Sequence, residues 1–188
     1  MLNQKQFCDR ATRELREIGK QVQTLAADRD LFRRLESEVV ASNPRLSENS
    51  AAFLAVVRAA YTDATTMRLR RLYAPDANLS LRRIVAQVSD YPELLHDKLT
   101  GKELDSDVAE LDRAGAYLKE HLDPHFAGRE RTSAALTSAN RELDRILDLL
   151  IDCLKRYYWI VADAHIDLAP AWEQDPLAVF RFAWIESQ

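Results

Sequence analysis

Residues 138–162 read SANRELDRILDLLIDCLKRYYWIVA, and this stretch decides the fold class of the chain. Its apolar residues recur at intervals of three and four, which is the period of one face of an α-helix. The stripe comprises Leu143, Leu147, Leu150, Leu154, Tyr157 and Val161. The apolar arc is widened beyond what a surface helix needs by Ile146, Leu149, Cys153 and Ile160. We therefore expect a helix that begins near Ser138 or Asn140 and that is either central in a bundle or part of a dimer interface.

The rest of the chain repeats this helical period, with cap and stop signals between the segments. Pro44 ends the first helix, Ser47 and Ser80 are suited to cap the next two, and Gly101 marks a break. The expected helices are about Gln4–Ala41, Ser47–Tyr73, Leu81–Val88, a short one after Pro92, and Glu103–Leu122. These segments predict an all-α bundle of about four long helices plus short ones. Because there is no repeat and no shift in composition, we expect residues 1–188 to form one domain.

Two further apolar segments need a partner. The helix that ends near Tyr73 carries a stripe that we expect to face the core, formed by Phe53, Val57, Ala60, Ala64 and Met67. The segment from Pro170 to Trp184 is rich in aromatic residues, and exposed aromatics at that density promote aggregation. We therefore expect this C-terminal segment to dock onto the bundle.

Composition limits the class of protein. The 188 residues are 47% hydrophobic and 30% charged, with a formal net charge of −4. This balance excludes a disordered chain and a strongly basic nucleic-acid binder, although local basic patches remain compatible with it. Charged residues interrupt every long apolar run, and Cys8 and Cys153 each lack a neighbouring cysteine. We expect a cytoplasmic protein with reduced thiols, no membrane contact and no cofactor.

Residues 121–131, HLDPHFAGRER, form the most suggestive polar stretch, whereas the common nucleotide and hydrolase signatures are missing from the sequence. His121, Asp123 and His125 bring two imidazoles and a carboxylate together, which suits a metal ion or a shared proton transfer. Pro124 disturbs the helical spacing of the two histidines, and a zinc site needs three or four ligands. The pattern therefore favours exposed histidines at a helix end over a metal site.

Charged residues also gather on and after the helix that ends near Tyr73. Asp63 shares a face with apolar residues, so we expect it to be partly buried and paired with Arg70 or Arg71 in a structural ion pair. A basic surface that holds phosphates is a second interpretation of the arginines in this region, which are Arg68, Arg70, Arg71, Arg82 and Arg83. A solvated face balanced by acidic residues is the more usual outcome for such a cluster.

The order of these features resembles the AbiU-type branch of the HEPN superfamily, which comprises small helical bundles from abortive-infection and related phage-defence contexts. The likeness runs from about residue 10 to residue 185. It rests on four segments, which read YTDATTMRLRRLY at 61–73, LSLRRI at 79–84, LDPHFAGR at 122–129 and VFRFAWI at 179–185. The resemblance implies a four- or five-helix bundle that often dimerises, and many such proteins are metal-independent ribonucleases.

In that family an Arg-x4–6-His motif supplies a phosphate-stabilising arginine and a general acid/base histidine. Here Leu122 stands at the arginine position and Gly128 at the histidine position, while Asp123 and Ala127 match. Because glycine has no group that transfers a proton, the usual mechanism does not carry over to this chain.

Three interpretations follow from the resemblance. The first is a catalytically degenerate HEPN-like protein that binds RNA or an antitoxin-like protein in a phage-defence or toxin–antitoxin setting. The second is an active metal-independent endoribonuclease in which His125 or His121, with Arg129 or Arg131, replaces the lost arginine–histidine pair across a dimer interface; Asp123 is the third candidate catalytic residue. The third is a helical interaction protein unrelated to RNA. The residues expected to hold phosphate are Arg129, Arg131, Arg70 and Arg71. A homodimer is expected from the apolar excess of the last helix.

Overall fold

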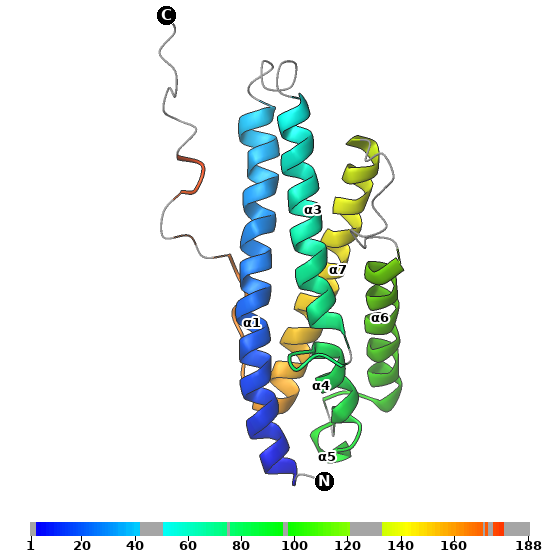
Figure 1. Ribbon diagram of the computed structural model, residues 1–188. Helices are drawn as coiled ribbons and strands as arrows, with labels where there is room; N and C mark the ends of the chain where they lie inside the picture. Colours follow the sequence, from blue (N-terminus) through cyan, green and yellow to red (C-terminus); the bar gives the residue numbers. More distant parts are fainter. Residues whose placement is uncertain are drawn as a thin grey trace, which may run out of the picture.

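A computed structural model describes residues 3–41, 51–74, 76–95, 98–120, 133–170, 172 and 175–178. Within these ranges every regular element is a helix, so the expected all-α class is confirmed. The elements in chain order are α1 Gln4–Arg34, the π-helical segment η1 Leu35–Val40, α3 Ala51–Tyr73, α4 Leu81–Val88, α5 Pro92–Leu95, α6 Gly101–Glu120 and α7 Ser133–Ala162. Figure 1 shows α1, α3, α6 and α7 as the long helices, with α4 and α5 near the end of the bundle that carries the N-terminus.

Side-chain caps explain where several helices begin. Asn3 and Gln6 form a capping box at the start of α1, and the Ser80 hydroxyl accepts a hydrogen bond from the Arg83 amide at the start of α4. The Thr100 hydroxyl accepts from the Glu103 amide, and the Glu103 carboxylate accepts from the Thr100 amide at 2.8 Å. The cap at Ser80 was predicted from the sequence. Because Thr100 caps α6, this helix begins at Gly101 and not at Glu103.

The start of α7 was predicted too late. The helix begins at Ser133, at least five residues before the expected Ser138 or Asn140. Leu136 is buried and lies seven residues before Leu143, so the buried stripe continues for another two turns toward the N-terminus. This spacing was the signal in the sequence that the boundary prediction missed.

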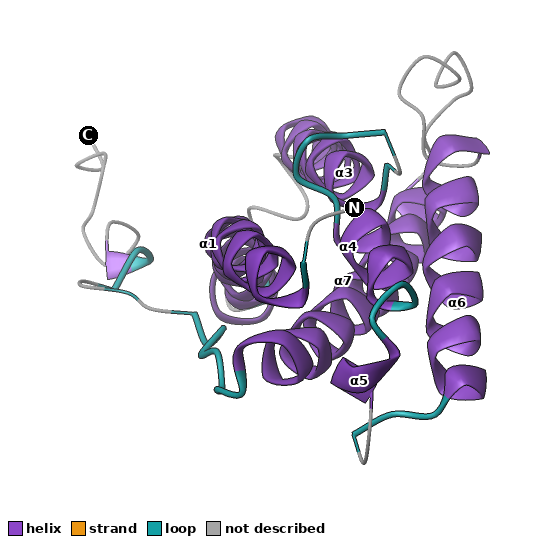
Figure 2. Ribbon diagram, turned by 90° about the horizontal axis from the view of Figure 1, so that it is seen from below, coloured by secondary structure: helices purple, strands orange, loops and turns teal. Residues whose placement is uncertain are grey.

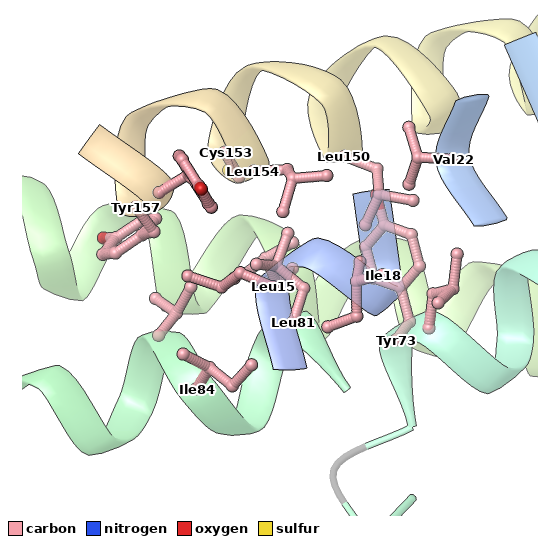
Figure 3. Close-up of a cluster of buried hydrophobic side chains, with 14 of the residues drawn as sticks. Leu15, Ile18, Val22, Tyr73, Leu81, Ile84, Leu150, Cys153, Leu154 and Tyr157 are labelled. Atoms are coloured by element: carbon pink, nitrogen blue, oxygen red, sulfur yellow. The ribbon is translucent and has the colours of Figure 1, made fainter. Parts of the chain in front are cut away.

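The core lies where α7 meets the other helices. Contacts join α7 to α1, α3, α4, α5 and α6, and Figure 2 shows α7 and α4 with α1, α3 and α6 around them. Figure 3 shows Leu150, Leu154 and Tyr157 of α7 above Leu15 and Ile18 of α1. These side chains are at most 1% exposed. The wide apolar arc of α7 is therefore explained by a central place in the bundle, which was one of the two interpretations of the sequence.

The prediction of which face of α3 is buried was wrong. Phe53, Ala60, Ala64 and Met67 are exposed, and Val57 is only partly buried. The buried face of α3 comprises instead Leu54, Thr62, Thr65, Thr66, Leu69, Leu72 and Tyr73.

Thr62 and Thr66 are tolerated on the buried face of α3 because their hydroxyls find partners close by. The Thr66 hydroxyl donates to the Thr62 carbonyl at 2.7 Å, and the Thr62 hydroxyl lies 2.8 Å from the Arg58 carbonyl and 2.7 Å from Oδ1 of Asn140. A hydroxyl that bonds the carbonyl one turn back can be buried without an unsatisfied donor. Apolar periodicity alone does not detect such a face.

The chain after α7 follows the surface of α1. Nε2 of Gln23 donates to the Ala169 carbonyl at 3.0 Å, and the Trp172 indole donates to Asp30 at 3.2 Å. Gly19 of α1 makes room for this segment, because a Cβ there would lie 2.6 Å from the Ile166 side chain. The expected docking of the C-terminal segment is thus confirmed for its described residues. The aromatic residues Phe180, Phe182 and Trp184 lie outside the described residues.

Candidate functional site

The polar stretch singled out in the sequence falls outside the part of the chain that the structure describes. Described residues end at Glu120 and resume at Ser133. The residues concerned are His121, Asp123, His125, Arg129 and Arg131. Their expected roles in catalysis and phosphate binding therefore stay predictions.

A cleft of about 520 Å³ lies between the C-terminal part of α3 and the second half of α6. The α3 side contributes the predicted phosphate ligand Arg70, and the α6 side contributes Lys119. The remaining lining residues are Tyr73, Ala74, Asp76, Leu111, Asp112, Gly115 and Ala116. The cleft thus brings two cations from different helices to one hollow.

Arg82 shapes the charge balance of this cleft. Its guanidinium donates two hydrogen bonds to the Asp112 carboxylate, at 2.7 and 2.8 Å. This bidentate pair lowers the pKa of the Asp112 carboxyl, chiefly through the hydrogen bond, and Asp112 therefore stays ionised and paired. Asp112 is thus compensated by Arg82, and Asp76 is a further carboxylate among the described lining residues.

Three of the five arginines considered as a basic surface are paired with acidic residues. Arg68 pairs with Asp28, Arg82 with Asp112, and Arg83 donates to Glu14 at 2.9 Å. Arg71 is exposed and is not among the residues that line the cleft. The arrangement therefore matches the alternative of a solvated face balanced by acidic residues, with Arg70 as the member of the group that lines the cleft.

The Tyr73 side chain lines the cleft but is not suited to proton transfer near neutral pH. Tyr73 is buried, its hydroxyl donates to the Ile146 carbonyl at 2.7 Å, and burial raises its pKa well above the ordinary value. Gly115 lies against Tyr73, with 3.7 Å between the Tyr73 Cβ and the position of an added Cβ. No histidine or cysteine is among the lining residues that the structure describes. The two cations that line the described cleft suit an anionic ligand.

A second polar cluster, which the sequence prediction missed, lies between α6 and α7. The Asp107 carboxylate accepts hydrogen bonds from Arg156, at 2.7 and 2.8 Å, and from the Tyr157 hydroxyl at 2.9 Å. The signal was present in the sequence, because Asp107 stands on the buried stripe of α6 between Leu104 and Leu111. Each buried polar atom of Asp107 has a partner, so this cluster is a structural connection between the two helices.

The predictions for Asp63 and for the cysteine thiols have different outcomes. Asp63 is partly buried on α3, as predicted, while its pairing with Arg70 or Arg71 stays a prediction. Burial raises the pKa of the Cys153 thiol to about 12, so this cysteine stays protonated and unreactive at neutral pH.

The described ranges lack the side-chain groups of a metal site. No group of three or more His, Cys, Asp or Glu side chains within them is placed to hold a metal ion. Likewise, no helix in those ranges combines the length and the apolar character needed to cross a bilayer. Neither protein-family models, nor curated proteins, nor solved structures yield a match to this chain. The candidate site therefore rests on the geometry of the cleft between α3 and α6.

Proposed function

We propose that this chain is a HEPN-like helical protein that binds RNA through the cleft between α3 and α6, with a ribonuclease motif that has lost its proton-transfer side chain. The single observation that carries the proposal is the convergence of Arg70 and Lys119 on that cleft. Arginine and lysine side chains on opposite walls suit the phosphates of a nucleic-acid backbone. The setting that the resemblance implies for such a protein is phage defence or a toxin–antitoxin pair.

Two further observations support the same site. Lys119 precedes His121 by two residues, so the stretch in which the family carries its catalytic motif follows the cleft directly in the sequence. Asp112, the lining carboxylate that would repel a phosphate most directly from α6, is neutralised by Arg82. Both features favour an anionic ligand over a cationic one.

Binding without cleavage is the form of the proposal that the residues favour. No histidine or cysteine is among the described lining residues, and Gly128 stands where the family histidine is expected. An active ribonuclease that uses His125 remains the alternative, and it is distinguished by a cleavage assay without metal.

The proposal is tested by fluorescence anisotropy with a labelled single-stranded RNA of about 12 nucleotides at several salt concentrations. Arg70→Ala and Lys119→Ala are each expected to weaken binding about tenfold and to make the salt dependence shallower, because each removes a phosphate contact. Arg113→Ala is the matched control, since Arg113 is an exposed cation on α6 that does not line the cleft. Its affinity for RNA should stay within twofold of that of the unaltered protein.

RNA binding that is equal in all three variants, or that does not depend on salt, would overturn the assignment of the cleft. RNA cleavage in the presence of a chelator, lost in His125→Ala at an unchanged melting temperature, would establish the active-ribonuclease alternative instead. Circular dichroism of each variant separates a local effect on binding from a loss of fold.

A further inference from the structure

The outer face of α3 exposes large apolar side chains. Phe53, Val56 and Met67 are 62%, 66% and 52% exposed, and all three belong to this one helix. Ala60 and Ala64 are also exposed and lie between them. With Arg71, these residues form what we call the outer stripe of α3: Phe53, Val56, Ala60, Ala64, Met67 and Arg71. On an ideal helix of 100° per residue they fall within an arc of about 80°.

An exposed apolar stripe of this kind usually marks a surface that another molecule covers. We propose that the outer stripe binds the outer stripe of a second copy of this chain, with the two α3 helices antiparallel. This homodimer differs from the one expected from the sequence, which placed the interface on α7. It is also independent of the RNA-binding cleft, because Arg70 and Lys119 are not members of the stripe.

The order of residues along the stripe identifies a second copy as the occupant, because the stripe matches itself when its direction is reversed. Setting Ala60 of one copy opposite Ala64 of the other brings Val56 within one residue of Met67. The same register sets Phe53 opposite Arg71. The centre of the contact then holds only small side chains, which allow close approach of the two helices, and larger apolar side chains fill both flanks.

Charge complementarity selects the antiparallel orientation. Arg71 is exposed and lies near the C-terminal end of α3, whereas the described exposed positions of its N-terminal half carry only apolar side chains. A parallel pair would bring the two Arg71 side chains together. In the antiparallel pair they are separated by the length of the stripe, about 27 Å for 18 residues at 1.5 Å each. Each Arg71 guanidinium then meets the ring of a Phe53, which is a favourable cation–π arrangement.

The size of the stripe sets the expected affinity. A single helix pair over about 27 Å buries less surface than the roughly 800 Å² per partner of a standard stable interface. We therefore expect a dimer that dissociates in the micromolar range, with a population that depends on protein concentration.

Sedimentation equilibrium from about 1 to 200 µM tests this association. The unaltered protein should pass from monomer to dimer in that range, and Met67→Glu should weaken dimerisation at least tenfold, because it puts a charge into the flank of the contact. Ala109→Glu is the matched control, since Ala109 is an exposed residue on α6, and it should leave the dissociation constant unchanged. A protein that is monomeric at 200 µM, or a dimer that Met67→Glu does not weaken, would overturn the proposal.

Cysteine cross-linking tests the register in the full-length chain. Ala60→Cys and Ala64→Cys are made separately with Cys8 replaced by serine, since Cys8 is only partly buried. Under mild oxidation, a mixture of the two variants should form the mixed disulfide at least tenfold faster than either variant links to itself. Preferential linkage of each variant to itself would indicate a parallel pair and contradict the proposed orientation. Absence of any cross-link would point to a different occupant, such as another protein or residues 179–188 of this chain, and would equally contradict it.

The two proposals fail separately. Met67→Glu should leave RNA affinity within twofold of the unaltered protein when both are measured below the dissociation constant of the dimer. Loss of RNA binding in Arg70→Ala, conversely, should leave sedimentation unchanged. A dimer without RNA binding would disprove only the proposed function, and RNA binding by a strict monomer would disprove only the dimer.

Discussion

Helices α7 and α3 both carry many apolar residues, yet the bundle uses them in opposite ways. In α7 the apolar stripe is buried on several sides, with Leu150 and Leu154 fully enclosed. In α3 the large apolar side chains of Phe53, Val56 and Met67 are turned to solvent, and the buried face contains three threonines beside its leucines. The difference teaches that apolar periodicity identifies which faces are able to be buried, but not which face meets a partner within the same chain.

The position of each helix explains the difference. Helix α7 contacts every other helix of the bundle from α1 to α6, so a wide apolar arc is needed to cover its surroundings. Helix α3 contacts α1, α4, α6 and α7, while Phe53, Val56 and Met67 of its outer stripe are exposed. Self-bonded threonine hydroxyls make the inner face compatible with burial, which leaves the apolar outer stripe for another use.

The largest expected difference in the free energy of unfolding is between truncation of the buried face of α7 and truncation of the outer stripe of α3. Leu150→Ala should lower the free energy of unfolding by about 2–5 kcal/mol, because it opens a cavity in the core around α7. Phe53→Ala removes a larger side chain from α3, but it should change the free energy of unfolding by only about 0.5 kcal/mol, since the ring is mostly in water. Urea unfolding monitored by circular dichroism at submicromolar protein concentration measures both. Equal losses in the two variants would contradict the distinction drawn between the helices.

Substitutions that remove a hydrogen bond of a buried hydroxyl on α7 or α3 should give the next largest loss of stability. Asp107→Ala should cost about 1–3 kcal/mol, because it leaves the buried Tyr157 hydroxyl without its acceptor. Thr66→Val should cost less than about 1 kcal/mol, since the hydroxyl that it removes bonds only the preceding turn of its own helix.

Asp107→Asn serves as the control for the first of these substitutions. It keeps an oxygen that can accept from Tyr157, so its melting temperature should lie between those of the unaltered protein and Asp107→Ala. A Thr66→Val variant that is less stable than Asp107→Ala would show that α3 depends on its buried hydroxyls more than the contacts indicate.

The smallest expected effect concerns the surface pair Arg82–Asp112 beside the cleft. The pKa of Asp112 is lower in the folded chain than in the unfolded one, so the pair stabilises the fold above the unfolded value, about 4. The stabilisation is lost as the pH falls through the lower, folded pKa. A double-mutant cycle with Arg82→Gln and Asp112→Asn should give about 0.2–1 kcal/mol of coupling at pH 7, since the pair is partly exposed. Coupling that grows below pH 4 would contradict this assignment.

Local signals in the sequence predicted much of the fold. Ser80 was recognised as a cap because a hydroxyl before an apolar period is suited to that role, and α7 was recognised from its stripe. The early start of α7 was missed, although Leu136 extends the stripe by seven residues. The burial of Thr66 was missed because its hydroxyl is satisfied by a bond that only the helical conformation creates.

The candidate site was less accessible to sequence reasoning. Arg70 was named as a phosphate ligand, but Lys119 was not, because the two residues lie 49 positions apart and meet only through the packing of α3 against α6. Asp112 and Arg82 were likewise separate residues until the packing of α4 against α6 paired them. A spacing rule within one helix cannot identify a cleft that two helices form together.

The sequence by itself determined that this chain is helical, where α1, α4 and α5 begin, and that α7 carries more apolar surface than a surface helix needs. The tertiary structure decided that α7 is central, that α3 turns Phe53 and Met67 outward, and that Arg70 and Lys119 share one cleft. The physical reason is that helical period and capping are set by residues within a few positions of one another. The choice of which face is buried depends instead on the summed packing of all the helices.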